Sequence, residues 1–302
     1  MNTETRLYAI NKCTAEYFHY LLHQPDGVEA KRYLYETRQL SDETVRAYCL
    51  GYAPNDKKRL LYYLRKKGFS EEEMIAANLA VKTESGEVIA RFRNRVMFPI
   101  TDACSRIIAF GGRLMSNEKS KWAPKYLNTS DTEIFRKSSI LFSFNRAARS
   151  KFRYVLLCEG YMDVIALYSA GFDNAVASLG TALTEEQIVL LRGITDSVVI
   201  AYDADEPGQA AADKAVHALS QVGLTVRVLQ VPKAKDSAEP VAKDPDEFIH
   251  RYGRDAFLSL IENASDEFSF RMRRLQVNND ISTGFGALNA LNESIRLITM
   301  QQ

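Results

Sequence analysis

The spacing of apolar residues divides the chain into three regions. In residues 1–80 apolar side chains recur at helical intervals, and the capping sequence SEEE at 70–73 starts a further helix just after Gly68. In residues 81–114 the apolar runs become short and separated by turn residues, which is typical of strands. From residue 153 onward strand-like and helix-like runs alternate, and beyond Asp244 the pattern is helical to the end.

The alternating region predicts a parallel sheet. Strands are expected at 154–158, 174–178, 197–202 and 224–231, with helices in the segments between them. Continuous apolar strands that alternate with helices are typical of a parallel, Rossmann-like sheet covered on both faces. The expected fold class is therefore α/β, with an α+β N-terminal subdomain and a helical C-terminal segment. The expected boundaries are 1–152, 153–240 and 241–302.

Charge is segregated along the chain although the formal net charge is only +1. Residues 91–153 carry 14 basic and 4 acidic side chains, a net of +10, whereas residues 154–302 carry 12 basic and 21 acidic side chains, a net of −9. Residues 1–90 are balanced, with 13 of each. An enzyme acting on polyanions needs one surface for phosphates and another for metal ions. Two solvated faces that attract one another would give the same segregation.

Cysteine spacing and hydropathy exclude several classes of protein. The 4 cysteines are scattered without a CxxC pair, which argues against a disulfide framework and against a zinc site in this chain. No apolar run is long enough to span a bilayer, and the first residues lack a signal-peptide pattern. We therefore expect a cytoplasmic protein without a membrane partner.

Acidic residues follow three of the expected strands. Glu159 follows the first strand, Asp203 and Asp205 follow the third, and Asp244 and Asp246 come shortly after the fourth. The carboxyl ends of parallel strands meet at one edge, where ligands bind. Carboxylates gathered there repel one another unless cations intervene, and oxygen ligands without histidine or cysteine favour Mg²⁺ or Mn²⁺. The sequence therefore predicts a two-metal site that acts on a phosphoryl group.

Several motifs occur in the order found in one family of enzymes. The acidic region contains EGYMD at 159–163, ASLGT at 177–181, YDAD at 202–205 and KDPDE at 243–247. The basic region contains FRNRVMFPI at 92–100, AFGGR at 109–113 and PKYLN at 124–128. Together these motifs resemble the RNA polymerase core of bacterial DnaG-type primases, including its toprim domain at 153–240. The acidic motifs alone are shared with topoisomerases, nucleases and recombination proteins.

The resemblance implies roles for individual residues. Glu159, Asp203, Asp205, Asp244 and Asp246 would be metal ligands, with Glu159, Asp203 and Asp205 catalytic and Glu159 either a ligand or the general base. Arg93, Arg95 and Arg113 would line the nucleic-acid groove, and Lys125, Lys137 and Arg113 would bind the nucleotide. Asp163 either orients the acidic edge or caps its helix, and Trp122 either stacks on a base or packs in a loop.

The resemblance also implies a reaction and its partners. The chain would synthesise short RNA primers from ribonucleoside triphosphates on single-stranded DNA, by two-metal-ion nucleotidyl transfer, in the bacterial nucleoid or replisome. The replicative helicase would bind only through a carboxyl-terminal module, and we expect neither that module nor the amino-terminal zinc module in this chain. Two alternatives remain: a toprim nuclease or topoisomerase-like enzyme that cleaves phosphodiesters, and a non-catalytic nucleic-acid-binding module.

Overall fold

The chain forms two compact units in a computed structural model. The first unit contains residues 1–151 and 160–187, and the second contains residues 152–159 and 188–302. The three-part division expected from the sequence stays a prediction, and contacts group residues 160–187 with the first unit. The structure describes residues 2–115, 124–180, 182–232, 240–279 and 282–299, so Trp122 lies outside the described residues.

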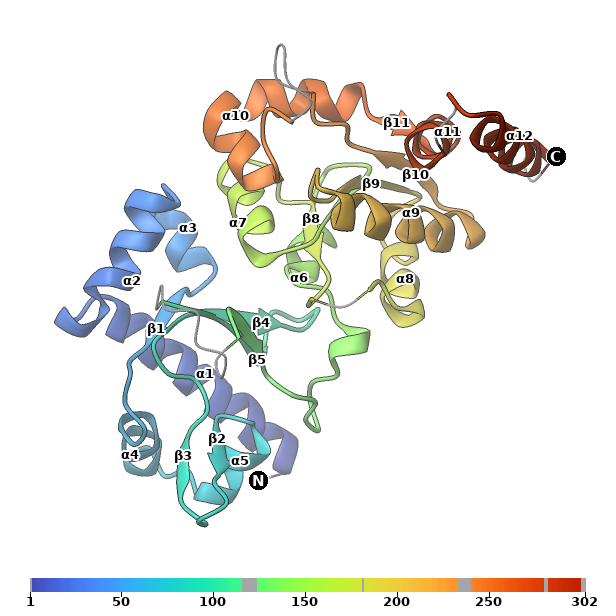
Figure 1. Ribbon diagram of the computed structural model, residues 1–302. Coiled ribbons are helices and arrows are strands. Elements are labelled where there is room, and N and C mark those ends of the chain that lie inside the picture. The colour runs from blue at the N-terminus through green and yellow to red at the C-terminus, as the bar shows by residue number, and fades with distance from the viewer. Residues whose placement is uncertain (1, 116–123, 181, 233–239, 280–281, 300–302) are drawn as a thin grey trace. The chain divides into compact units, whose positions relative to one another are not determined.

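The first unit is built on a four-stranded antiparallel sheet in the order β1-β4-β5-β6. Its central strands are β4 (Arg95–Thr101) and β5 (Ile107–Leu114), and its edges are β1 (Gly51–Ala53) and β6 (Tyr126–Asn128). The long helix α1 (Thr3–Leu22) packs against this sheet (Figure 1), where Phe18 meets Phe110 edge-on with ring centroids 5.8 Å apart. This packing buries the apolar stripe that the helical spacing predicts.

Short elements surround this sheet in the first unit. The hairpin β2 (Ala80–Lys82) and β3 (Val88–Ala90) is antiparallel, as its tight turn requires. The α-helices are α2 (Val28–Arg32), α3 (Asp42–Ala47), α4 (Arg59–Lys66), α5 (Glu71–Ala76), α6 (Phe144–Ala147) and α7 (Tyr161–Ser169). There are also the 3₁₀ helices η1 (Pro25–Gly27) and η3 (Lys137–Ser139) and the π-helix η2 (Tyr33–Thr37). The short strand β8 (Ala175–Ala177) also belongs to this unit and bridges to Phe142.

Helix α5 begins at the capping box that the sequence predicts. The Ser70 hydroxyl accepts a hydrogen bond from Glu73 N, and the Glu73 carboxylate accepts one from Ser70 N at 2.8 Å. The same carboxylate forms an ion pair with the Arg6 guanidinium of α1. These hydrogen bonds, with Arg6 the larger cause, lower the pKa of Glu73 from 4.5 to about 2.

This pair gives the first unit a pH-dependent contribution to stability. Because the folded-state pKa of Glu73 is lowered, the contribution is present above the unfolded-state pKa and is lost as pH falls towards 2. We expect Glu73→Gln, which keeps the capping acceptor, to lower the urea midpoint at pH 7. The difference in urea midpoint between the variant and wild type should shrink as the pH falls from 4.5 to 2. Glu84→Gln, in an exposed turn, is the matched control, and a deficit independent of pH would contradict the ion-pair origin.

The second unit holds a mostly parallel sheet with strands in the order β11-β10-β9-β7. Strands β7 (Val155–Cys158), β9 (Ser197–Ala201) and β10 (Thr225–Val228) are parallel, and the two-residue strand β11 (Ser265–Asp266) is antiparallel to β10. All four residues of β7 are buried, as expected for a strand inside a covered parallel sheet. The α/β fold class is confirmed.

Helices follow the strands in the order that the sequence predicts. They are α8 (Glu185–Arg192), α9 (Glu206–Gln221), α10 (Pro245–Glu262), α11 (Glu267–Asn278) and α12 (Gly284–Thr299). Helix α9 contacts both β9 and β10, as Figure 1 shows. Helix α10 is kinked at Gly253, whose φ of 78° lies in the left-handed region that glycine tolerates. In the described part of the chain, no helix has the length and apolar content to cross a membrane.

Three strands lie where the sequence did not predict them. Residues 1–80 were expected to be helical, but β1 forms there by pairing with β4. The sequence predicts no strand at residues 126–128, but β6 forms there by pairing with β5, and Lys125 lies in the bend just before it. The carboxyl-terminal segment was expected to be helical throughout, and β11 interrupts it. Each of these strands has two or three residues and exists because a distant strand supplies its hydrogen bonds.

Candidate active site

The acidic site begins where two neighbouring strands end together. Parallel pairing places Cys158, the last residue of β7, opposite Ala201, the last residue of β9. Glu159 follows β7 directly, and Asp203 lies two residues beyond β9. The Asp203 backbone N–H donates a hydrogen bond to Glu159 Oε1 at 3.0 Å. The fold therefore brings together two acids that are 44 residues apart in the sequence.

Asp205 is held by the start of helix α9. It is the N-cap residue, and its Oδ1 accepts a hydrogen bond from Gly208 N at 2.9 Å. Pro207 occupies the first turn of α9, where a missing backbone N–H costs no hydrogen bond. Asp205 is exposed, so its other carboxylate oxygen is open to a ligand.

Gly208 is a site residue that sequence reasoning missed. A Cβ atom there would lie 2.4 Å from the Asp203 carbonyl oxygen and 2.8 Å from Glu159 Oε1. Both distances are shorter than real contacts allow, so a side chain at this position would push the acids apart. The sequence does place a glycine three residues after Asp205. That spacing alone does not show whether other atoms pack closely against the glycine.

Asp244 is brought to the same region by a second capped helix. It is the N-cap of α10, and its Oδ1 accepts a hydrogen bond from Glu247 N at 2.7 Å. The backbone N–H of Ala204 donates to the Lys243 carbonyl oxygen at 2.7 Å, which fastens the segment before α10 to the segment after β9. Asp203 and Asp244 are close enough for the charge of Asp244 to raise the pKa of Asp203.

Asp246 has a different environment from the other four acids. Its side chain is only 2% exposed, and His250 Nε2, one helical turn further along α10, lies 3.0 Å from its Oδ1. Pairing with a histidine is one way to bury a carboxylate, because an isolated buried charge is costly. The role of Asp246 as a metal ligand stays a prediction, and His250 lies directly beside its carboxylate.

Electrostatic repulsion marks this region as a site for cations. Burial, followed by the charges of Glu159, Asp244 and Asp205, raises the pKa of Asp203 from 3.8 to about 7, although Lys243 opposes the shift. Burial and the charge of Asp205 likewise raise the pKa of Glu159, against the effect of its hydrogen bond from Asp203. Carboxylates that raise one another's pKa are stabilised by a cation.

The acids do not form a closed chelate. In the ranges that the structure describes, no group of three or more histidine, cysteine, aspartate or glutamate side chains converges tightly enough to hold a metal ion. The donor set still fits a hard divalent cation, because it consists of carboxylate oxygens. Magnesium commonly binds through one or two carboxylates together with substrate phosphates, which suits such an open arrangement.

Asp163 acts as a helix cap. Its Oδ2 accepts a hydrogen bond from Gly160 N at 3.2 Å at the start of α7, and its side chain is buried. Of the two roles open to it in the sequence, the structure supports capping.

Among the basic residues of the first unit, Arg95 is buried. Only 4% of it is exposed, and its guanidinium donates to three backbone carbonyls, those of Gly112, Pro124 and Lys125, at 3.0, 3.0 and 3.4 Å. Burial lowers the pKa of Arg95. The sequence predicts that Arg95 contacts nucleic acid, whereas the structure shows it supporting the segment that carries Lys125.

The remaining predicted basic residues are more accessible. Lys125 is exposed, with its Nζ 5.8 Å from the ring centroid of Tyr126. Arg113 is half-buried, and its guanidinium lies 4.2 Å from the ring centroid of Tyr33. Arg93 and Lys137 are also half-buried. The Lys137 backbone N–H donates to Asp131 Oδ1 at 3.0 Å. This contact involves the backbone and does not fix the Lys137 ammonium group.

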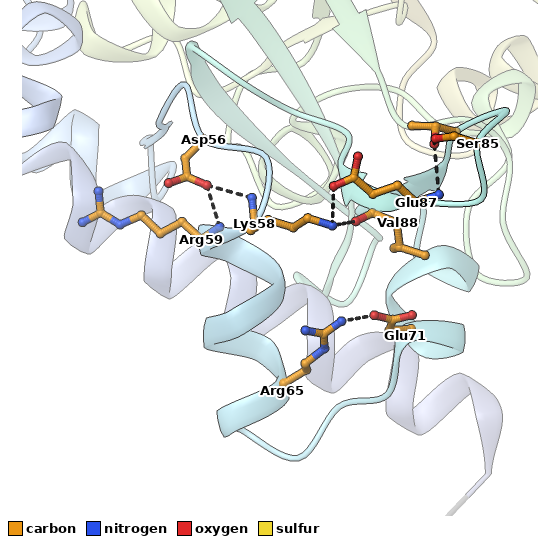
Figure 2. A network of polar contacts seen from close by, with 9 residues as sticks. Asp56, Lys58, Arg59, Arg65, Glu71, Ser85, Glu87 and Val88 are labelled. Carbon is orange, nitrogen blue, oxygen red and sulfur yellow. Dashed lines mark hydrogen bonds and ion pairs between the residues drawn. The ribbon is translucent and has the colours of Figure 1, made fainter.

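Helix α4 carries a second set of basic residues, most of which are already ion-paired. Figure 2 shows Lys58 between Glu87 and the Val88 carbonyl, and Arg65 paired with Glu71. Arg59 pairs with Asp26. Lys66 and Lys67 instead lie over the rings of Tyr62 and Tyr63, at 4.5 and 5.6 Å from the ring centroids. Pairing reduces the net charge that this helix offers to phosphates.

Comparison with known proteins identifies the family. Residues 17–148 match the N-terminal domain of the DNA primase catalytic core, and residues 156–249 match the Toprim-like family. The Escherichia coli primase catalytic core is 33% identical, with a TM-score of 0.80 over 97% of this chain and 91% of that one. The chain belongs to the DnaG primase catalytic core family.

Other members of the DnaG primase family support this assignment. A DnaG primase catalytic domain bound to single-stranded DNA is 32% identical, with a TM-score of 0.80 over 98% of this chain and 93% of that one. The DNA primase of Clostridium acetobutylicum is 39% identical over 270 residues, or 89% of this chain and 43% of that protein. The chain thus spans a little under half the length of this full-length relative.

Proposed function

We propose that this chain polymerises ribonucleotides into short RNA primers on a single-stranded DNA template, as the catalytic core of a primase. The observation that carries the proposal is the acidic edge of the second unit in a DnaG-type catalytic core. Glu159, Asp203 and Asp205 follow two neighbouring strands there, and Asp244 caps α10 close to Asp203. A relative of this core has been solved with single-stranded DNA bound, which supports that template class.

Divalent cations would be held by these carboxylates, with Asp246 as a further candidate. When bound, Mg²⁺ or Mn²⁺ would polarise the reacting phosphoryl group and stabilise charge on the attacking and leaving oxygens. Asp205 presents an oxygen outward while its Oδ1 caps α9, and Asp203 and Glu159 are linked through the Asp203 N–H. The fixed backbone positions of these acids would reduce the reorganisation needed at the transition state.

Glu159 is suited to accept the proton of the attacking 3′-hydroxyl. Burial raises its pKa, which brings a carboxylate closer to the range of an effective general base. Its Oε1 already accepts a hydrogen bond from Asp203 N, so the other oxygen would receive the proton. Metal binding by Glu159 is the competing role, and Glu159 would transfer the proton only when the cations are held mainly by the aspartates.

The basic residues of the first unit would hold the polyanions. Lys125 and Lys137, with Arg113, would neutralise the triphosphate of the incoming ribonucleotide, as lysine does at phosphates. Arg93 and Arg113 would contact the template backbone. Arg95 would support nucleotide binding indirectly, because its guanidinium binds the carbonyls of Pro124 and Lys125 and so holds the segment that carries Lys125.

Primer synthesis is tested directly with single-stranded DNA, labelled ribonucleotides and Mg²⁺ or Mn²⁺. We expect short RNA products that depend on template and metal. The same preparation is assayed for cleavage of labelled single-stranded DNA and for relaxation of supercoiled DNA. Cleavage or relaxation without RNA synthesis would instead support the toprim nuclease or topoisomerase-like alternative, and DNA binding without any reaction would support the binding module.

Template binding should depend steeply on salt, since neutralised phosphates release counterions. We expect Arg93→Ala to reduce the slope of log affinity against log salt by about 1. Arg95→Ala should leave that slope unchanged while lowering thermal stability, because the Arg95 side chain is buried and donates to three backbone carbonyl groups. Salt titrations of single-stranded DNA binding measure both slopes.

Lys66→Ala on helix α4 is the matched control for this titration, because Lys66 is exposed. Its slope should equal that of wild type. A flatter slope for Lys66→Ala with a normal slope for Arg93→Ala would place the template over α4 instead.

A further inference from the structure

A pocket of about 450 Å³ opens in the first unit and has no place in the proposed reaction. Its walls come from the end of β4, the β4–β5 turn and helices α3, α6 and α7, and it includes Tyr48, Ser105 and Tyr168. This volume falls in the range of small-molecule sites in proteins.

Arg146 supplies the first cationic group of the pocket. Its guanidinium carbon lies 4.6 Å from the ring centroid of Tyr48 and 4.8 Å from that of Tyr168, so the two rings fix its position. Its Nη2 donates to the carbonyl oxygen of Ala47, and its Nη1 lies 3.5 Å from the Tyr168 hydroxyl. All of these partners are neutral. The charge of Arg146 is therefore oriented by its surroundings without being neutralised by them.

Arg149 supplies a second guanidinium three residues later. Its Nη1 donates to Ser105 Oγ at 2.9 Å and its Nη2 to the Ala103 carbonyl at 3.3 Å. Within the part of the chain that the structure describes, neither Arg146 nor Arg149 forms an ion pair with a carboxylate. Two preplaced guanidinium groups with only neutral partners favour an anion, and the fork geometry of arginine matches phosphate.

Two polar side chains, Asn145 and Ser105, lie beside these arginines. Asn145, only 7% exposed, donates from Nδ2 to Ser105 Oγ at 2.9 Å. Ser105 Oγ thus accepts from both Asn145 and Arg149, which leaves its own hydroxyl hydrogen to donate. The Ser105 hydroxyl can therefore donate to a phosphate oxygen held by the two arginines.

One carboxylate, Asp173, also lines the pocket. It is exposed, and its Oδ1 accepts a hydrogen bond from the Ser150 hydroxyl. A carboxylate would repel a simple anion, but it accepts hydrogen bonds well from hydroxyl groups. A ligand suited to both ends of the pocket therefore carries a phosphate for the arginines and hydroxyl groups for Asp173.

We propose that this pocket binds a small phosphate monoester of a hydroxylated ring, the chemistry shared by sugar phosphates and nucleoside monophosphates. The phosphate meets Arg146 and Arg149, and a ring hydroxyl donates to Asp173. The site requires neither template nor metal.

Ribose 5-phosphate binding, measured by isothermal titration calorimetry in EDTA, tests the proposal. We expect binding to wild type, weaker binding of inorganic phosphate, and none of ribose. Removing one charge-assisted contact with Arg149→Ala should weaken ribose 5-phosphate binding about tenfold or more. Asp173→Asn should abolish the preference for ribose 5-phosphate over inorganic phosphate. The affinity for adenosine 5′-monophosphate, measured in parallel, shows whether the pocket prefers a nucleoside monophosphate or a sugar phosphate.

Matched variants separate this pocket from other phosphate-binding groups. Arg153→Ala removes an exposed arginine four residues further along that does not line the pocket, and it should bind as wild type does. Lys125→Ala should also leave ribose 5-phosphate binding unchanged. Loss of binding in Lys125→Ala with normal binding in Arg149→Ala would overturn the proposal, as would equal affinity for inorganic phosphate. Circular dichroism of each variant verifies folding. Failure of primer synthesis leaves these outcomes unaffected, because no template or nucleotide triphosphate is present.

Discussion

Asp205→Asn should abolish RNA synthesis while leaving the protein folded. Loss of residues that only orient a metal ligand commonly costs ten- to a hundredfold, so loss of a ligand should lower the rate by at least about a hundredfold. The fold is expected to survive because asparagine is as good an N-cap as aspartate and still accepts the hydrogen bond from Gly208 N. Removing the charge of Asp205 also weakens the electrostatic repulsion on Asp203, because that charge raises the pKa of Asp203.

The measurement combines primer synthesis with thermal unfolding. Wild type and variant should unfold within a few degrees of one another, whereas the variant makes no detectable primer across a range of Mg²⁺ and Mn²⁺ concentrations. Asp255→Asn, an exposed aspartate on α10 away from its capped end, is the control and should retain full activity. Near wild-type synthesis by Asp205→Asn with the same metal dependence would show that Asp205 is not a metal ligand.

Lys125→Ala should impair nucleotide use strongly and leave template binding nearly intact. Lys125 is exposed and immediately precedes β6, and Arg95 binds the carbonyl groups around it. Losing one charge-assisted contact with a triphosphate costs on the order of 1.5–3 kcal/mol, or roughly ten- to a hundredfold in kcat/KM for the ribonucleotide. Single-stranded DNA binding measured without nucleotide should change by less than about twofold, since one phosphate contact at most is involved.

Lys82→Ala, at the exposed end of β2, is the control for a lost lysine charge. It should match wild type in both assays. Loss of DNA binding in Lys125→Ala with normal nucleotide use would assign Lys125 to the template groove. Unchanged kinetics and binding would show that it is a solvated surface residue.

Periodicity predicted the parallel sheet of the second unit because its strands are continuous apolar runs. The expected strands at 154–158 and 197–202 correspond to β7 and β9, with ends shifted by one residue at most. Their ends in turn locate Glu159 and Asp203, whose proximity the structure confirms through a hydrogen bond. A site at strand ends can therefore be predicted from the sequence when the strands themselves are buried and regular.

The burial of polar residues could not be predicted from the sequence in the same way. Arg95 lies in a motif that resembles a nucleic-acid-binding segment, yet it is 4% exposed. Its burial depends on carbonyl groups from residues 17 and 29 positions away, which no local pattern reveals. Gly208 was missed for a related reason, since the atoms that exclude a side chain there belong to Glu159 and Asp203. The short strand β1 likewise depends on its pairing with β4.

The hydrogen bond from Ala204 N to the Lys243 carbonyl has a consequence for how the acidic edge moves. Ala204 stands between Asp203 and Asp205, and Lys243 immediately precedes Asp244, so one bond of 2.7 Å joins the backbones that carry three of the acids. If the segment before α10 swings outward, it must break this bond or carry the residues after β9 with it. Deuterium uptake at a single amide, that of Ala204, thus reports whether the edge is assembled, without a probe attached to any acid.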